Sequence, residues 1–484
     1  MKRKSKLIII ALSIFMLSTY TYCAPGGDMP GGAPGGTSNA SVTHTGATTI
    51  TSDLTEESRS YSSSTGSENA LLVTGGTSTI SNITLNKSGD ASGDEADFYG
   101  TNAGVLVKSG ALNIKGGTIT TDGSHANAVF AYADGVINIS DAKINTSNNN
   151  SGAIMVTGGG TLTADNVTAE TKGNSSAPIR SDRGGGTLTV NKGTYTSNGT
   201  GSPVIYSTAD ITVNDAKLIS NASEGVVVEG KNSFTLNGTT LEATNTQLNG
   251  NSETYKAIFI YQSMSGDADE GTSSFTSKKS KITNNKGDVI FVTNTSTVIT
   301  LENNEIINND SDGAFLRATS AKWGNSGSNG GIVTLNLVNQ DIRGDIILDS
   351  ISTIDMNMSN KSFYKGAINN NNESSSVKLN ISSDSIFVLT EDTYLTSLEN
   401  EVSDNSNIYA NGNKLYVDGK EVSINEDTAP DGIDSNESKE ETKVANTNTS
   451  NEKLMFEIAG GVCLVLIIGI IILLVRNKKL NKQD

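Results

Sequence analysis

The chain contains few of the residues that cross-link or rigidify a protein: of its 484 residues, 2 are Cys, 6 are Pro, 2 are His and 1 is Trp. Cys23 lies near the N-terminus and Cys463 lies in the apolar segment near the C-terminus, so the sequence predicts no disulfide between them, and the fold must be held by packing alone. The scarcity of histidine argues against a Ser-His-Asp site and against a His-rich metal site.

Charged residues are also few, at 18%, and acidic side chains dominate, which gives a net charge of -17. Nucleic acids and anionic membrane surfaces reward Lys and Arg, so the charge argues against both as partners and no nucleic acid is expected. Gly, Thr, Ser and Asn are abundant while Leu and Ala are sparse. This composition disfavours a helical protein, and the many short aliphatic runs disfavour a disordered one.

The first 23 residues carry Lys2, Arg3, Lys4 and Lys6 before an apolar run that ends at Leu17. This arrangement is typical of a secretory signal peptide, which is removed on export. Cleavage is expected near Cys23. Lipidation of Cys23 is the alternative, which Tyr22 disfavours because lipoprotein signals place Gly or Ala there.

The other end holds the uncharged stretch 458–475, followed by the basic tail 476–484. Such a stretch is long enough to cross a bilayer core of about 30 Å as a helix. Positive flanks stay in the cytoplasm. The sequence therefore predicts a single-pass protein of the plasma membrane, anchored by helix 454–475, with the bulk of the chain extracellular and the C-terminus cytoplasmic.

A repeat fills the region between these ends, in which two apolar residues at alternate positions precede a turn residue, two variable residues and a third apolar residue. Its second apolar anchors fall at 114, 139, 164, 190, 213 and 236. Alternation predicts half-buried strands, and the Gly, Asn or Asp after them suits a bend with positive φ. The eight clearest copies of this turn position are Gly116, Asp141, Asn166, Lys192, Asp215, Gly238, Asn303 and Asn339.

A second family of short apolar strands interleaves with the first, among them 129–131, 154–156 and 226–228. A period of about 25 residues with several strands per unit indicates a solenoid. The repeat resembles the right-handed parallel β-helix of the pectate-lyase-like fold, and the Thr/Asn/Gly-rich texture is similar to that of adhesin-like surface proteins. The expected fold is all-β, with eleven or twelve turns stacked at about 4.8 Å.

These patterns divide the chain into seven parts. We expect a signal peptide at 1–23, a Gly/Pro-rich polar segment at 24–68, the β-helix at 69–376, a C-terminal β cap at 377–424, an acidic disordered stalk at 425–453, the transmembrane helix at 454–475 and a cytoplasmic tail at 476–484.

The most unusual side chains of the repeat are Arg180, Asp182 and Arg183. Arg180 is the only charge in a column formed by the middle residues of the second strand family. We expect this column to face outward as an apolar stripe, covered by inserted loops or used as a contact surface. The column consists of Leu106, Phe130, Met155, Arg180, Ile205, Val227, Phe259, Ile290, Phe315 and Ile347. Arginine binds carboxylates through two parallel hydrogen bonds, and carboxylates accept hydrogen bonds from sugar hydroxyls, so this cluster is the candidate ligand site. The alternative is an ion pair within the solenoid, between Arg183 and either Asp182 or Asp210. Tyr206, Tyr261 and Trp323 are further candidates, because an exposed ring can stack on a sugar, although a ring that anchors a loop is the default interpretation.

Acidic loops offer a second kind of site, because calcium takes six to eight oxygen ligands from flexible loops. The candidates are Asp94, Asp97, Asp267 and Asp269, but their spacing matches no EF-hand, and solvated acidic turns are the favoured interpretation. No cofactor other than calcium is indicated.

The resemblance implies a rod that binds an extracellular glycan or a host or neighbouring cell surface. The alternative is a membrane-tethered polysaccharide lyase or glycoside hydrolase. The paired carboxylates that glycosidases need across the scissile bond are not evident, and neither are the clustered motifs of polygalacturonases. The sequence therefore favours a non-catalytic, adhesin-like binding protein. A purely structural role as a cell-envelope spacer is a further alternative, whereas the lack of a regular Thr-x-Thr ladder at one strand position argues against an ice-binding rod.

Overall fold

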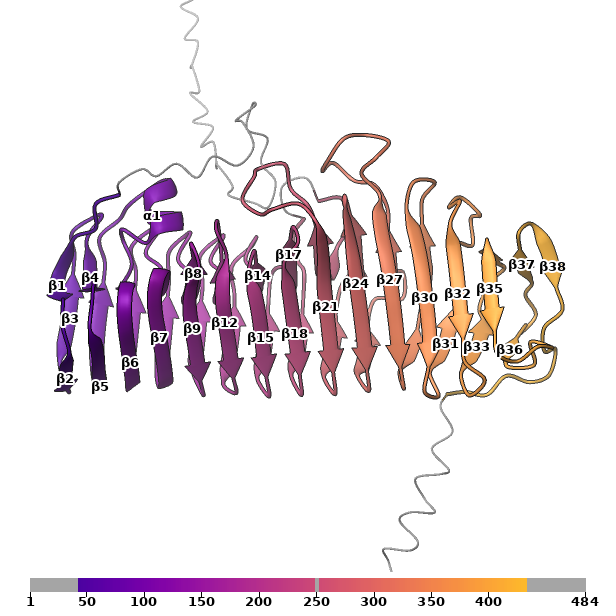
Figure 1. Cartoon of the computed structure of the whole chain (residues 1–484), viewed down its shortest axis with the longest axis horizontal. Coiled ribbons are helices and arrows are strands. Elements are labelled where there is room, and N and C mark those ends of the chain that lie inside the picture. The colour runs from indigo at the N-terminus through magenta and orange to yellow at the C-terminus, as the bar shows by residue number, and fades with distance from the viewer. Residues whose placement is uncertain (1–41, 249–251, 433–484) are drawn as a thin grey trace, which may run out of the picture. The chain divides into compact units, whose positions relative to one another are not determined.

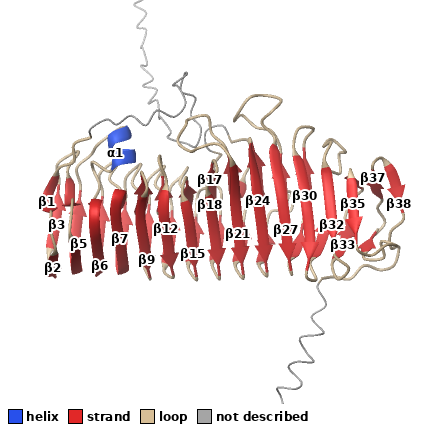
Figure 2. Ribbon diagram, viewed as in Figure 1, coloured by secondary structure: helices blue, strands red, loops and turns tan. Residues whose placement is uncertain are grey.

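The computed structural model describes residues 42–248 and 252–432, and its main unit, which ends at Ala429, coils into a parallel β-solenoid of about 15 turns (Figure 1). Strands dominate the described residues, and their one helix is the short α1 (Asp94–Tyr99) (Figure 2). The predicted all-β parallel β-helix is confirmed. Its right-handed sense stays a prediction.

Each turn of the coil adds one strand to each of three faces, which we call A, B and C in chain order. β5 (Thr77–Lys87), β6 (Val105–Thr121) and β7 (Val129–Thr146) bend without interruption from one face to the next, β5 through B and C and the others through all three. Face A otherwise contains β1 (Gly46–Ile50), β4 (Asn69–Val73), β8 (Ile154–Thr157), β11 (Ile179–Ser181), β14 (Ile205–Ser207), β17 (Val226–Glu229), β20 (Lys256–Tyr261), β23 (Asp288–Thr293), β26 (Leu316–Ala318), β29 (Ile346–Leu348), β34 (Thr393–Leu395) and β37 (Leu415–Val417).

The other two faces follow the same order. Face B contains β2 (Leu54–Glu57), β9 (Gly160–Asp165), β12 (Gly186–Asn191), β15 (Asp210–Asn214), β18 (Ser233–Asn237), β21 (Thr272–Lys278), β24 (Thr295–Glu302), β27 (Gly331–Val338), β30 (Thr353–Ser359), β32 (Val377–Ile381) and β35 (Ser397–Asn400). Face C contains β3 (Ser60–Ser63), β10 (Thr168–Thr171), β13 (Thr194–Ser197), β16 (Lys217–Ser220), β19 (Thr240–Ala243), β22 (Lys281–Asn284), β25 (Glu305–Asn308), β28 (Asp341–Arg343), β31 (Phe363–Gly366), β33 (Ile386–Leu389) and β36 (Ile408–Tyr409).

The core consists of inward side chains stacked along the axis. Ile114, Ile139, Ala164, Val190 and Val213 stand opposite one another in successive turns, and none is more than 1% exposed. Burying each aliphatic side chain contributes roughly 1.5–3 kcal/mol. No turn can bury its inward face alone, so neighbouring turns stabilise one another.

The bend between faces B and C depends on one residue per turn. All eight predicted turn residues, from Gly116 to Asn339, have φ between 47° and 70°. This left-handed conformation costs little for Gly and is several-fold enriched for Asn and Asp, which explains the preference seen in the repeat. The prediction of these bends is confirmed.

The solenoid extends beyond its predicted bounds of 69–376 at both ends, which explains why it has more than eleven or twelve turns. β1, β2 and β3 lie within 24–68, which was predicted to be a Gly/Pro-rich polar segment. β1 pairs in parallel with β4, and β2 and β3 pair with β5. Thr and Ser fill many positions of these first strands, so the aliphatic repeat is weak there.

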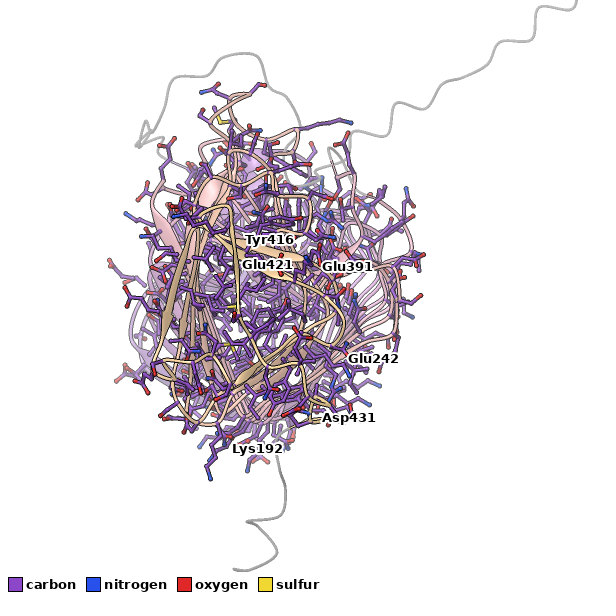
Figure 3. All side chains as sticks on the ribbon, turned by 90° about the vertical axis from the view of Figure 1, so that its right-hand side faces the viewer. Lys192, Glu242, Glu391, Tyr416, Glu421 and Asp431 are labelled. Atoms are coloured by element: carbon purple, nitrogen blue, oxygen red, sulfur yellow. The ribbon has the colours of Figure 1, made fainter. Side chains whose placement is uncertain are left out.

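The segment 377–424, predicted as a separate cap, also continues the coil. β32 to β37 add parallel strands to all three faces, and the Tyr394 and Tyr416 rings stack with centroids 4.8 Å apart. The final turn differs, because β38 (Lys420–Val422) returns antiparallel to β37. Figure 3, a view along the axis onto this end, shows Tyr416 and Glu421 of that hairpin.

The predicted signal peptide 1–23, most of the stalk 425–453, the transmembrane helix 454–475 and the tail 476–484 lie outside the described residues. Within the described ranges, no helix has the length and apolar character needed to cross a bilayer.

Candidate functional site

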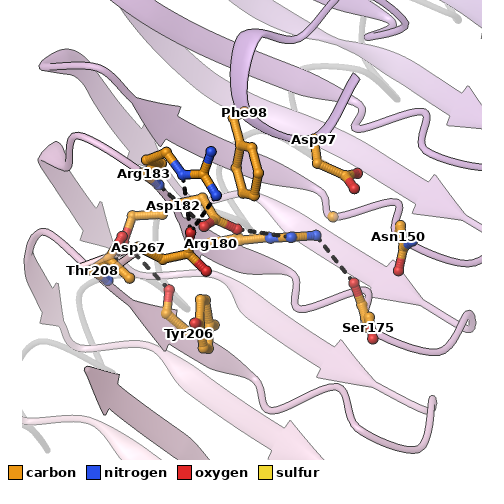
Figure 4. A network of polar contacts seen from close by, with 12 residues as sticks. Asp97, Phe98, Asn150, Ser175, Arg180, Asp182, Arg183, Tyr206, Thr208 and Asp267 are labelled. Atoms are coloured by element: carbon orange, nitrogen blue, oxygen red, sulfur yellow. Dashed lines mark hydrogen bonds and ion pairs between the residues drawn. The ribbon is translucent and has the colours of Figure 1, made fainter. Parts of the chain in front are cut away.

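Arg180 lies in β11 in the middle outward column of face A, between Met155 of the preceding turn and Tyr206 of the next. Its side chain is not open to solvent: the residue is 7% exposed. One guanidinium nitrogen donates to Asp182 at 2.9 Å and another donates to the backbone carbonyl of Ser175 at 3.1 Å (Figure 4). The alternative predicted from the sequence pairs Arg183 with Asp182 or Asp210; the structure instead pairs Asp182 with Arg180.

Asp182 is the acceptor at the centre of this contact. It also accepts the backbone N–H of Arg183 at 3.1 Å, and it is 4% exposed. Burial raises the pKa of Asp182 to about 7, although the charge of Arg180 acts in the opposite direction. A carboxylate removed from water in this way favours its neutral form unless a cation stays beside it.

Arg183 joins two loops that cover face A: the helix loop, residues 88–104, which contains α1, and the acidic loop, residues 262–271. Its guanidinium donates twice to Asp267 at 2.9 and 2.7 Å and once to Asp94 at 3.4 Å. It also lies 4.0 Å from the ring centroid of Phe98 (Figure 4). Arg183 therefore clamps the two loops together, a cation–π contact adding to the ion pairs.

A third carboxylate, Glu229, was not among the predicted residues. It is 1% exposed and accepts hydrogen bonds from Tyr206 at 2.6 Å, from Tyr261 at 3.0 Å and from Ser263 of the acidic loop. Burial raises the pKa of Glu229 above its ordinary value. Its sequence signal is an acidic residue directly after the aliphatic run 226–228.

The apolar stripe of face A is covered by loops, which is the first of the two predicted alternatives; the other was an exposed contact surface. Leu72, Leu106, Phe130 and Met155 form a first apolar cluster with Ala103 of the helix loop. The second apolar cluster combines side chains of face A with the tryptophan loop, residues 319–330, and its buried members are Val227, Phe259, Tyr261, Phe291 and Trp323. Trp323 lies 5.1 Å from Phe259 and 5.4 Å from Tyr261, between ring centroids.

The outward column of face A differs from the predicted one in three turns. Tyr206, Phe291 and Arg317 occupy it, where the sequence pattern placed Ile205, Ile290 and Phe315. Arg180 is therefore not the only charge in the column. Arg317 stands five turns away, about 24 Å at the usual strand spacing, and its Nε donates to Asp288 at 2.6 Å.

Each of the four acidic calcium candidates contacts a basic side chain, and two of them share the same one. Asp94 and Asp267 pair with Arg183, Asp97 lies 2.8 Å from the ring of His125, and Asp269 lies 2.8 Å from Lys231. Within the part of the chain that the structure describes, no three His, Cys, Asp or Glu side chains converge as a metal site would need. Calcium binding stays a prediction without added support.

The structure thus brings the predicted side chains together, but as a closed network. Arg180, Asp182, Tyr261 and Trp323 are buried and Tyr206 is half-buried, whereas Arg183 is exposed, with its guanidinium held by the two loops. Such an arrangement fastens loops onto a solenoid; a substrate could reach its carboxylates only if the loops were lifted. Comparisons with protein-family models, with curated proteins and with solved structures gave no match.

Proposed function

We propose that the protein is an outward-facing, membrane-anchored binding protein of the cell surface, adhesin-like in role, whose solenoid recognises an extracellular glycan or a neighbouring cell. The observation that carries this proposal is the closed network on face A. The side chains best suited to chemistry are buried beneath loops and make hydrogen bonds to other residues of the protein; they are Arg180, Asp182 and Glu229. A binding role needs no open cleft, since long lateral faces of a solenoid supply contact area.

Membrane anchorage belongs to the same proposal and rests on the sequence of the two chain ends. An uncharged stretch at 458–475 followed by basic residues favours an anchor, and the basic and apolar start favours export. A chain that stops after residue 453 is then expected to appear in the medium, while the full chain stays with the membrane fraction and is cleaved by protease added to intact cells. Full-length protein in the medium, or protection from that protease, would contradict the placement.

The binding role is tested by exposing the full chain, purified in mild detergent, to a panel of polysaccharides. We expect retention on at least one polymer without turnover. New reducing ends or unsaturated products in the same incubation would contradict the proposal and favour the lyase or hydrolase alternative. Binding to no polymer of the panel and to no cell surface would also overturn it.

A further inference from the structure

Face B is the broad side of the solenoid that Figure 1 turns toward the viewer, with its strands in regular succession from β5 to β35. The inserted loops described above leave from the two edges of face A, whereas faces B and C are joined by the tight left-handed bends. Face B therefore keeps a regular outward surface along the axis.

The middle outward position of face B forms a column without charge. Strand register aligns the same position through thirteen successive turns, and each of these side chains is half-buried or exposed. The column consists of Thr55, Thr79, Asn113, Asn138, Thr163, Thr189, Thr212, Thr235, Thr276, Thr300, Asn336, Asn357 and Asn380. The first charge after them is Glu399 in the next turn.

The ends of this column differ from its middle in hydrogen bonding. At the C-terminal end, Asn380 donates to Asn357 at 2.7 Å and Asn357 donates to Asn336 at 3.0 Å, so these amides stabilise the stack itself. In the middle, the hydroxyls of five consecutive threonines hydrogen-bond to no other described residue. They are Thr163, Thr189, Thr212, Thr235 and Thr276, and we call them the threonine file.

We infer that the threonine file binds an uncharged, hydroxyl-rich polysaccharide lying extended along the solenoid axis. This inference rests on the proposed binding function and assigns it a site and a ligand class. A hydroxyl both donates and accepts, as the hydroxyls of a neutral sugar do. The file offers five such groups at a repeat of about 4.8 Å, over about 19 Å from first to last.

Charge and geometry narrow the ligand class. The column holds no Arg or Lys that could grip a carboxylate or sulfate, and the net charge of -17 repels acidic glycans. The outward neighbours two residues earlier vary, from Thr161 and Thr187 to Asp210 and Val298. A single file of hydroxyls fits a linear chain, whereas a planar lattice would need the second column too.

The strength of such binding depends on ligand length. The column has no aromatic ring on which a sugar could stack, and each hydrogen bond exchanged with water contributes little by itself. Many weak contacts along one polymer act together, because each bound unit raises the effective concentration of the next. Apparent affinity is therefore expected to rise with chain length up to the length of the file.

The experiment is affinity electrophoresis of the full chain in mild detergent, with a soluble linear neutral glucan in the gel, its shorter oligomers as competitors, and polygalacturonate in a parallel gel. The test variant is Thr189→Val/Thr212→Val/Thr235→Val, which removes three hydroxyls and keeps the β-branched shape. The matched control on face C is Thr168→Val/Thr194→Val/Thr240→Val. We expect the glucan to retard the wild type and the control equally, and the test variant to bind at least tenfold more weakly.

Thr212→Lys serves as a second test variant, since one outward lysine leaves the core untouched and places a charge in the file. It is expected to weaken glucan binding while the circular dichroism of the folded protein is unchanged. Equal glucan binding by wild type, test variant and Thr212→Lys would place the site elsewhere and overturn the inference, but leave the binding function standing. Retardation by polygalacturonate alone would do the same. No retardation by any polymer would contradict both.

Discussion

Asp182 shows how burial couples one side chain to pH. Its pKa rises from the ordinary 3.8 to about 7 in the folded protein, so the native state binds this proton more tightly than the unfolded chain does. The stabilising contribution of that proton is present in full below about pH 4 and is lost as the pH rises through about 7. Glu229 acts in the same direction, because burial raises its pKa as well.

We therefore expect the urea concentration at the midpoint of unfolding to decrease as the pH is raised from 4.5 to 7.5 in the wild type. Asp182→Asn should flatten this fall, because an amide has no proton to lose and still accepts from Arg180. Asp182→Asn/Glu229→Gln should flatten it further. Identical pH profiles for the wild type and both variants would show that these carboxyls do not titrate in this range.

Lys192 occupies the left-handed bend that Gly, Asn or Asp fills in the other clear repeats, with φ at 60°. A residue with a Cβ pays roughly 1–2 kcal/mol in that conformation, so Lys192→Gly is expected to raise the free energy of unfolding by up to about 1 kcal/mol. The control is Lys217→Gly, an exposed lysine in strand β16, which should lose about 0.5–1 kcal/mol. Denaturant unfolding measures both, and a loss at both positions would contradict the expectation.

At the scale of structural elements, Arg183 holds the helix loop and the acidic loop together. Arg183→Ala removes the ion pairs to Asp94 and Asp267 and the contact with Phe98. Because the guanidinium is 43% exposed, the loss of global stability should stay near 1 kcal/mol. The local effect is larger: amide hydrogen exchange should accelerate in residues 262–271, with little change in the core strands.

The control for this clamp is Lys231→Ala, which breaks the exposed pair with Asp269 in the same loop. It should leave exchange in the acidic loop close to wild type. Equal acceleration in both variants would mean that Arg183 has no special role in holding the loops.

The sequence predicted the strand families, the bends and an outward apolar stripe, because each follows from a local period. It misplaced the outward residue in three turns, where apolar residues stand next to one another. Alternation cannot tell which of Ile205 and Tyr206 points outward when both are hydrophobic. The contacts among the residues of the candidate site could not be predicted for another reason. Arg183 and Asp267 are 84 residues apart, and only the folded loops bring them together.

For the whole molecule, stability depends on contacts between neighbouring turns, so damage to one turn should divide the solenoid. Val213→Asp places an unpaired carboxylate in a position that is 0% exposed, at a cost of several kcal/mol. Limited proteolysis is then expected to cut near β15 and release two resistant fragments. Thr212→Asp is the matched control, since the adjacent side chain points outward, and it should resist cleavage like the wild type.

The tryptophan loop gives the molecule a built-in optical reporter. Trp323 is the sole indole of the chain, it is 3% exposed, and it packs on Phe259 beneath its own loop. Its emission therefore reports on one spot of face A and on nothing else. A compound that lifts the covering should shift that emission to the red, whereas a polymer lying along the threonine file should leave the spectrum unchanged.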